Sequence, residues 1–392
     1  MQLFDNTKIA FAAKDDQELM KAHWMFVMIG KPWTVKVGKV LVNIAKALHI
    51  PYGWAIRNNL FSHFCGGETI GECAQATKIL DAHNVGTILD YSVEGKQSEE
   101  DFKSTFDELM DVVRTAHGNK HIPFSVFKVT GIARFALLEK VNRGDQLTEV
   151  ERVEFNLVQS RVDAICKASA EVDTPVFIDA EESWIQDTID VLATEMMERY
   201  NQKRAIVYNT IQLYRHDRLD FLRHSHQKAV DGNYFLGVKL VRGAYMEKER
   251  DRAEELDYVS PIQPDKASAD RDFDAALQFC VEHIDRVACC AGTHNEASSE
   301  LLTRLMAEHS IEKNDPRIYF AQLFGMSDQI SFNLASLGYN VAKYVPYGPI
   351  REVIPYLIRR AEENTSVKGQ SSRELKLIKE EIARRKAERK KS

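Results

Sequence analysis

Two adjacent arginines lie near the carboxyl-terminal end of the sequence, on a segment that can form an amphipathic helix. If residues 351–364 are helical, four polar or aromatic side chains share one face of that helix: Tyr356, Arg359, Arg360 and Glu363. A planar guanidinium binds a carboxylate through two parallel hydrogen bonds, which lysine cannot reproduce. The pair therefore indicates a site for an anionic group. The alternative is a solvated helix in which Arg359 pairs with Glu363.

More polar side chains follow short apolar segments in the middle of the chain. They include Lys128, Asp179, Gln212, Lys239, Arg242, Thr293, His294, Asn295, Gln322 and Tyr344. Each alone has an ordinary structural explanation, since a lysine at the end of a strand usually faces solvent. If the segments are parallel strands of one barrel, these side chains meet at its mouth. Together they indicate a pocket with basic and hydrogen-bonding groups, suited to a small substrate that carries a carboxylate.

The segment Arg242-Gly243-Ala244-Tyr245 is the most informative of these strand ends. Small residues after a strand let the backbone approach a ligand closely, and the neighbouring arginine can bind a phosphate. No G-x-G-x-x-G motif follows any of the strand-like segments, which argues against a dinucleotide-binding fold.

Eight strand-like segments alternate with longer helical stretches. They are 85–91, 123–130, 175–181, 205–212, 235–242, 286–293, 317–323 and 339–346. Parallel strands need a helix between neighbours, so eight such units predict a (β/α)8 barrel of the TIM type, with a doubly wound sheet as the alternative. The connection 132–172 is long enough for two helices, and Arg143-Gly144-Asp145 marks the break between them.

By composition the chain divides into three parts: an N-terminal helical region at 1–83, the barrel at 84–366 and a basic tail at 367–392. Helical periodicity covers Asp15–Ile29 and Val35–Leu48. The second stretch mixes lysines with an apolar face, so it could rest on a membrane surface, although burial against the protein is the commoner outcome. Residues Leu375–Ser392 have little apolar face and predict a solvated helix.

The composition of the 392 residues, 44% hydrophobic and 28% charged, is ordinary for a folded protein of enzyme size. A formal net charge of -6 gives no reason to expect nucleic-acid binding. Six cysteines are too few for a disulfide framework and match no zinc pattern, so we expect a reducing compartment and no metal. The N-terminus has no signal-peptide pattern, and no run of 18 apolar residues occurs. These features predict a cytoplasmic protein, with membrane contact only peripheral, on the inner face.

Five segments together resemble the proline dehydrogenase family of flavoenzymes. In chain order they are Phe177–Glu182, Lys239–Tyr245, Thr293–Asn295, Gln322 with Gly325-Met326, and Tyr356–Asn364. The resemblance covers about residues 85–366, and the last segment is the most specific. Leu89–Glu94 is similar to the monofunctional form, so we expect no appended aldehyde dehydrogenase or DNA-binding module.

This resemblance implies a distorted barrel that binds FAD without a Rossmann fold and whose last helix covers the mouth. The catalytic residues would be Lys128, Asp179 and Lys239, with Lys239 standing where many bacterial members have arginine. The substrate would contact Lys128, Leu240, Ala244, Tyr344, Tyr356, Arg359 and Arg360. FAD would contact Ile178, Asp179, Gln212, Lys239, Val241, Arg242, Gly243, Ala244, Thr293, His294, Asn295 and Glu363.

The implied reaction is the oxidation of L-proline to 1-pyrroline-5-carboxylate, the first step of proline catabolism to glutamate. Hydride would pass to flavin N5, and the reduced flavin would deliver its electrons to a quinone. Tyr344 favours proline, because a smaller residue at this position goes with 4-hydroxyproline. The alternatives are a hydroxyproline dehydrogenase, another flavin barrel such as methylenetetrahydrofolate reductase, and a non-catalytic amino-acid sensor. The sequence makes no prediction of the oligomeric state.

Overall fold

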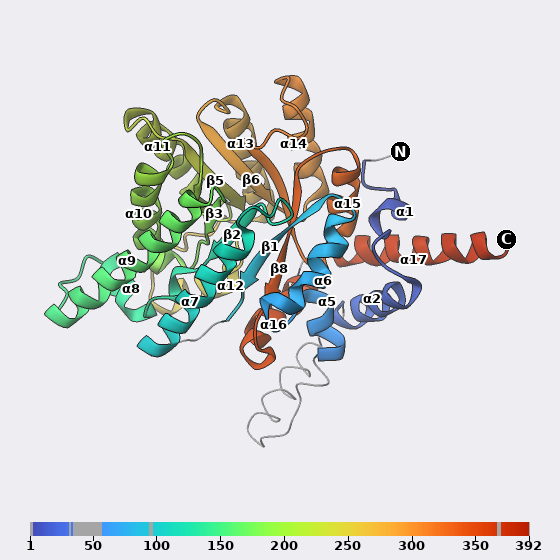
Figure 1. Ribbon diagram of the computed structural model, residues 1–392, viewed down its shortest axis with the longest axis horizontal. Helices are drawn as coiled ribbons and strands as arrows, with labels where there is room; N and C mark the ends of the chain where they lie inside the picture. Colours follow the sequence, from blue (N-terminus) through green and yellow to red (C-terminus); the bar gives the residue numbers. More distant parts are fainter. Residues whose placement is uncertain (1–2, 31–32, 34–56, 94–96, 367–369, 392) are drawn as a thin grey trace, which may run out of the picture. The chain divides into compact units, whose positions relative to one another are not determined.

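The structure, a computed structural model, describes residues 3–30, 33, 57–93, 97–366 and 370–391. Eight strands form a closed barrel in the order β1 to β8 (Figure 1). They are β1 Val85–Tyr91, β2 Phe124–Phe127, β3 Val176–Ile178, β4 Val207–Gln212, β5 Leu236–Val241, β6 Val287–Gly292, β7 Ile318–Leu323 and β8 Val341–Tyr347. The prediction of a (β/α)8 barrel is confirmed, and the doubly wound alternative is wrong.

Helices separate consecutive strands throughout the barrel. They are α7 Glu99–Ala116, α8 Phe135–Asn142, α9 Glu149–Glu171, α10 Ser183–Tyr200, α11 Arg218–Asp231, α12 Met246–Glu255, α13 Lys266–Glu282, α14 Glu296–Glu308 and α15 Asp328–Ser336. The connection between β2 and β3 contains both α8 and α9, as predicted, and the chain leaves the helical conformation between them at Gly144, where φ is +72°. Short helices also cover Arg57–Phe61 and Val129–Gly131.

The strands pair in parallel, and their register brings the ends of neighbours to the same level. Gln212 at the end of β4 is paired with Val241 at the end of β5, and Lys239 is paired with Cys290 of β6. Every residue of β4 and of β8 is buried, as expected for parallel strands covered on both faces. All six cysteines are buried as free thiols.

The chain divides into two compact units, 1–94 together with 322–392, and 95–321. In the second unit, α10 and α11 pack against β4, and α13 packs against β5 and β6 (Figure 1). Aromatic rings fill the space between its strands: Phe124 stacks on Phe177 with 4.3 Å between ring centroids, and the edges of Tyr208 and Tyr319 contact Phe124. This filled interior holds the strand ends in fixed positions.

The first unit contains the helices at both ends of the sequence. They are α1 Thr7–Ala10, α2 Asp16–Ile29, α5 Ser62–Phe64, α6 Ile70–Asp81, α16 Ile350–Ser366 and α17 Gln370–Arg389. The interpretation of the tail as a solvated helix is wrong, because Leu377 and Ile378 of α17 are only 1% exposed and join a core with Phe26 and Val353. A few apolar residues are enough to hold α17 against this core, because its buried charged residues Glu374 and Glu381 also contact the rest of the protein. The predicted helix at Val35–Leu48 lies outside the described residues.

Four charged side chains from distant segments meet in this first unit, three of them buried and one, Lys14, partly buried. The Asp328 carboxylate binds the ammonium groups of both Lys14 and Lys343. Lys343 also donates to the backbone oxygens of Met326 and Leu323, at 2.6 and 3.4 Å. Glu374 of α17 accepts a hydrogen bond of 3.0 Å from the amide of Ser327, which has a left-handed φ of 52°. The cluster therefore holds the turn between β7 and α15.

Glu374 makes the stability of the protein depend on pH. Burial, together with the charge of Asp328, raises the pKa of Glu374 to about 8. Between the ordinary carboxyl pKa and pH 8 the folded state keeps a proton that the unfolded chain releases, so this group lowers the free energy of unfolding as pH rises. The limiting slope is about 1.4 kcal/mol per pH unit.

Urea unfolding between pH 5 and 8 tests this prediction. We expect Glu374→Gln to show a flatter pH dependence than the unmodified protein, because glutamine mimics the protonated carboxyl at every pH. Equal slopes for the two proteins would contradict the assignment.

Candidate active site

Three charged side chains meet at the ends of β2, β3 and β5. The Asp179 carboxylate receives a short hydrogen bond from Lys239, and Lys128 lies 3.7 Å from its other oxygen. Lys239 is buried, with its ammonium 5.3 Å from the centre of the Phe177 ring. Two ammonium groups and one carboxylate leave a positive charge at this position, so the cluster can attract an anionic group.

A second carboxylate, Glu181, lies just beyond this cluster. Its oxygens accept hydrogen bonds from the amide and the hydroxyl of Thr130. Burial, aided by the charge of Glu182, raises the pKa of Glu181 to about 7. Glu181 therefore changes protonation near neutral pH. Glu181 lies within the segment Phe177–Glu182 that contributes to the family resemblance, but it is not among the predicted site residues.

Gln212, a predicted cofactor contact at the end of β4, is buried, and only the nitrogen of its side-chain amide is hydrogen-bonded within the described part of the protein. The side-chain nitrogen donates to the backbone oxygen of Glu181 at 2.9 Å. The side-chain oxygen has no hydrogen-bond partner among the described residues. Because a buried oxygen of this kind is rarely left unsatisfied, it is a candidate acceptor for a ligand.

Arg242, after β5, is held on all sides by neighbours. Its guanidinium donates to Asp270, to the Thr293 hydroxyl and to the Ser298 hydroxyl, at 2.7, 2.8 and 3.0 Å. The guanidinium carbon also lies 4.3 Å from the centre of the Phe273 ring. These contacts place a rigid positive charge beside the beginning of α14, where backbone amides favour anions.

Gly243 and Asn295 have backbone roles that explain their residue types. The φ of Gly243 is +133°, and a Cβ there would lie 2.4 Å from the ring of Tyr214, so only glycine fits. Asn295 caps α14, accepting from the amides of Ala297 and Ser298. The backbone conformation therefore explains why glycine and asparagine occur at these two positions, whether or not a ligand contacts them.

The remaining predicted residues of the second unit lie at the same strand ends. Ile178 and Leu240 are fully buried, Val241 and His294 are partly buried, and Ala244 is exposed. Among the predicted residues of this unit, the structure brings Lys128, Asp179 and Lys239 together as one group, and Arg242 and Thr293 as another. Their roles toward substrate and cofactor stay predictions.

In the first unit, the predicted helix with the arginine pair is present as α16. Arg360 and Tyr356 are buried, and the guanidinium carbon of Arg360 lies 5.2 Å from the Tyr356 ring centre. Arg359 is partly buried, and Tyr344 is buried on β8. The side chain of Glu363 is outside the described part, and the covering of the barrel mouth by α16 stays a prediction.

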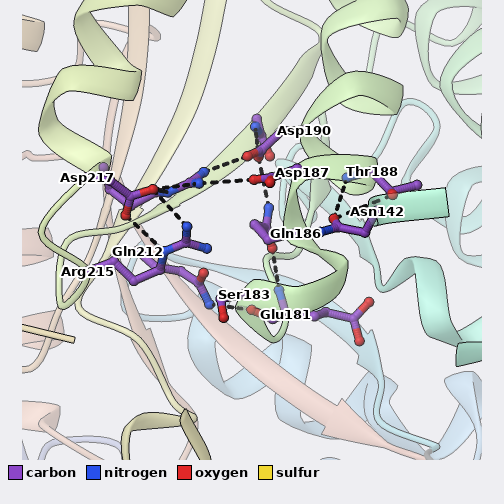
Figure 2. Close-up of polar contacts among 12 residues, drawn as sticks. Asn142, Glu181, Ser183, Gln186, Asp187, Thr188, Asp190, Gln212, Arg215 and Asp217 are labelled. Carbon is purple, nitrogen blue, oxygen red and sulfur yellow. Dashed lines mark hydrogen bonds and ion pairs between the residues drawn. The ribbon is translucent and has the colours of Figure 1, made fainter. Parts of the chain in front are cut away.

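Three residues that the sequence analysis did not identify are connected by hydrogen bonds to residues at the strand ends. Asp270 holds Arg242, and the α10 pair Gln186 and Asp190 connects to Glu181 (Figure 2). Gln186 and Asp190 have the i, i+4 spacing of side chains that face each other on a helix, which is the only signal in the sequence. That spacing is too common to indicate a role without the fold.

A closed barrel of eight parallel strands, with charged and amide side chains gathered at the strand ends, defines an enzyme of the (β/α)8-barrel class. Residues 73–373 match the sequence model of the family described as proline dehydrogenase. The chain belongs to this family, and it is an oxidoreductase of the kind that acts on proline.

Known relatives agree with this assignment. Proline dehydrogenase 1, mitochondrial, of Dictyostelium discoideum is 33% identical over 379 residues, which are 86% of this chain and 66% of the relative. The human protein of the same description is 37% identical over 61% of this chain and 40% of its own length. The carbapenem antibiotics biosynthesis protein CarD of Pectobacterium carotovorum is 30% identical, covering 88% of this chain and 89% of that protein. The chain thus spans between two fifths and about two thirds of these two mitochondrial relatives.

Solved structures show the same fold. Proline utilization A of Bdellovibrio bacteriovorus, inactivated by N-propargylglycine, superposes with a TM-score of 0.72 at 18% identity, over 94% of this chain and 39% of that chain. Proline utilization A of Bradyrhizobium japonicum gives a TM-score of 0.64 at 20% identity, over 79% of this chain. At these identities the likeness supports the barrel and its surrounding helices.

Proposed function

We propose that this protein oxidises L-proline to 1-pyrroline-5-carboxylate, using bound FAD, in the catabolism of proline. The observation that carries the proposal is the family match over residues 73–373, which contains every predicted site residue. The direct test is turnover of L-proline by the FAD-loaded protein with a soluble quinone, with the cyclic imine product identified by mass spectrometry. Absence of product would contradict the proposal.

The residues at the ends of β4, β5 and β6 fit FAD as the cofactor. Gln212 offers a buried acceptor oxygen, Gly243 is exposed just after the end of β5, and Arg242 suits an anionic phosphate. Together with Ile178, Val241, Ala244, Thr293, His294, Asn295 and Glu363, they would hold the cofactor. When bound, FAD supplies the two-electron acceptor that the side chains themselves lack.

The substrate carboxylate would be bound by Lys128, Arg359 and Arg360. Tyr344, Tyr356, Leu240 and Ala244 would enclose the ring, and Asp179 with Lys239 would hold Lys128 in place. Clamping the carboxylate fixes the ring in one orientation, which can lower the barrier by several kcal/mol. The substrate amine must be neutral, because its lone pair stabilises the positive charge that develops as hydride leaves.

Proline is preferred over 4-hydroxyproline in this proposal. Tyr344 is buried on β8, and its ring would occupy the space that the hydroxyl of 4-hydroxyproline needs. Comparing kcat/KM for the two substrates on one preparation distinguishes a proline dehydrogenase from a hydroxyproline dehydrogenase.

We also propose a quinone as the electron acceptor and a peripheral site on a membrane, with the protein otherwise in the cytoplasm. Among the described residues, no helix combines the length and apolar character needed to cross a bilayer. The candidate contact surface consists of Met20, Trp24 and Met28, spaced four residues apart on α2, which are 37%, 61% and 56% exposed.

The charge of the sequence around α2 favours an anionic membrane as the partner of this surface. Residues 19–67 contain six lysines and arginines and no aspartate or glutamate. Exposed tryptophan and methionine beside lysines are typical of helices that lie in the interface of anionic bilayers.

We expect the double variant Trp24→Ser, Met28→Ser to lose most of its binding to vesicles of phosphatidylglycerol and phosphatidylcholine, measured by sedimentation. Apolar burial of a tryptophan is worth on the order of 2 kcal/mol, so the loss should exceed tenfold. The control is Val150→Ser, Val153→Ser on α9, where the side chains are 77% and 62% exposed. Equal binding by both variants would contradict the proposal, as would a second copy of the chain covering this face in solution.

A further inference from the structure

A buried network of hydrogen bonds leads from Asp190 on helix α10 to the side chain of Gln212 (Figure 2). Asp190 accepts from the Gln186 amide nitrogen at 2.9 Å. The Gln186 oxygen accepts from the backbone amide of Glu181 at 2.7 Å, and the backbone oxygen of Glu181 accepts from Gln212 at 2.9 Å. All four residues are buried. Nothing in the proposed reaction uses Asp190 or Gln186 directly.

The hydrogen-bonding groups fix the direction of this chain. A carboxylate such as Asp190 only accepts, so the nitrogen of Gln186 must face it, and the Gln186 oxygen then faces the Glu181 amide, which only donates. The Glu181 carbonyl also only accepts, so the Gln212 nitrogen must face it. The Gln212 oxygen therefore points away from Glu181 as an acceptor. Among the hydrogen-bonding atoms of this network, it is the one that has no partner among the described residues.

Asp190 is a firm anchor for this arrangement. Its first oxygen also accepts from the Asn209 amide at 2.8 Å, and its second oxygen forms a 2.5 Å ion pair with buried Arg218. Arg218 is held in turn by Asp217, which also pairs with Arg215. A carboxylate with three donors has one stable position, and so does the amide that binds it.

We infer that Gln186 and Asp190 are positioning residues, which hold the Gln212 amide with its oxygen toward the cofactor. The group that this oxygen recognises is an N–H donor. The imide N–H of the flavin ring is such a donor, so the inference rests on the FAD proposed above. A free glutamine side chain would turn its nitrogen or its oxygen to the ligand. The Glu181 carbonyl removes that choice, and Gln186 and Asp190 hold the Glu181 backbone in place.

A purely structural role for Gln186 makes a different prediction from a positioning role. A structural residue lowers the stability of the protein and leaves the affinity for FAD unchanged. A positioning residue weakens FAD binding by more than its effect on stability explains. Affinity for FAD and unfolding of the cofactor-free protein therefore separate the two.

The experiment compares three variants with the unmodified protein, each prepared without cofactor. Gln186→Met removes the hydrogen bonds to Asp190 and to the Glu181 amide. Gln212→Met removes the acceptor oxygen itself and shows the largest loss of FAD affinity to be expected. Thr188→Val is the matched control: Thr188 is buried on the same helix, and its hydroxyl bonds to the Leu138 carbonyl at 3.3 Å outside the chain. The dissociation constant for FAD is measured by flavin fluorescence, and thermal unfolding is measured on the cofactor-free samples.

We expect the FAD dissociation constant to rise about tenfold in Gln186→Met and Gln212→Met, and to stay within twofold in Thr188→Val. The KM for proline at saturating FAD should stay within twofold in Gln186→Met. A Gln186→Met variant with unchanged FAD affinity would overturn the inference and leave the proposed function intact. If the unmodified protein binds no FAD, both fail.

Should Gln186→Met not fold, Asp190→Asn keeps the shape of the side chain. Its single acceptor oxygen can no longer satisfy Gln186, Asn209 and Arg218 as the carboxylate does, so Gln186 and the Glu181 backbone are held less firmly. We expect weaker FAD binding here as well, by a smaller factor than in Gln212→Met. Unchanged affinity in Asp190→Asn would equally overturn the inference.

Discussion

The variant Arg360→Met is expected to raise the KM for L-proline roughly 100-fold, equivalent to about 3 kcal/mol. Arg360 is buried on α16 beside the Tyr356 ring, so a carboxylate bound there would be shielded from water. Removing one partner of a desolvated charge pair leaves the other unpaired, which is why the expected effect is large. Arg359→Met should act in the same direction. Steady-state kinetics on FAD-loaded protein measure both effects.

Arg351→Met is the control for this prediction. Arg351 lies on the same helix, α16, but its side chain is exposed, so its removal should leave the KM within twofold of the original value. An unchanged KM in both Arg359→Met and Arg360→Met would contradict the assignment of the arginine pair to the substrate carboxylate.

The variant Asp328→Asn should have the largest effect on stability. It removes the one carboxylate that binds both Lys14 and Lys343, the latter completely buried on β8. The two ammonium groups together hold the pKa of Asp328 well below its usual range against the opposing effect of burial. Leaving buried charges without their partner costs about 3 to 5 kcal/mol of unfolding free energy. Equilibrium urea unfolding at pH 6 measures the loss.

An exposed ion pair provides the comparison for Asp328→Asn. Asp107 lies 2.6 Å from Lys103 on the surface of α7, and both side chains are exposed. Asp107→Asn should cost less than about 1 kcal/mol, because solvent screens such pairs. If the two variants lost equal stability, the buried cluster would not hold the β7–α15 turn in the way proposed here.

The fold followed from the sequence because its signals were local and repeated. Each strand was bounded by polar residues or glycine, and eight repeats left few arrangements other than a barrel. The division of residues 132–172 into two helices was likewise visible in Arg143-Gly144-Asp145. The prediction that the tail is a solvated helix was wrong, because the burial of Leu377 depends on contacts with α2 and α16, which no local pattern in α17 reveals.

The site was predictable only for residues at strand ends. Lys128, Asp179 and Lys239 come from separate strands, and the barrel alone brings them together. Gln186 and Asp190 could not be found in this way, because they act from a helix through the backbone of Glu181. The orientation of the Gln212 amide depends on contacts that only the folded chain creates.

The central claim is tested most directly by adding L-proline, without oxygen, to the protein loaded with FAD and following the visible absorption of the flavin. The account predicts that the flavin band bleaches with proline and changes far less with 4-hydroxyproline. A flavin that is bound and stays oxidised with proline would contradict the proposed reaction. Failure to bind FAD at all would contradict the interpretation of the strand-end residues and favour a non-catalytic amino-acid sensor.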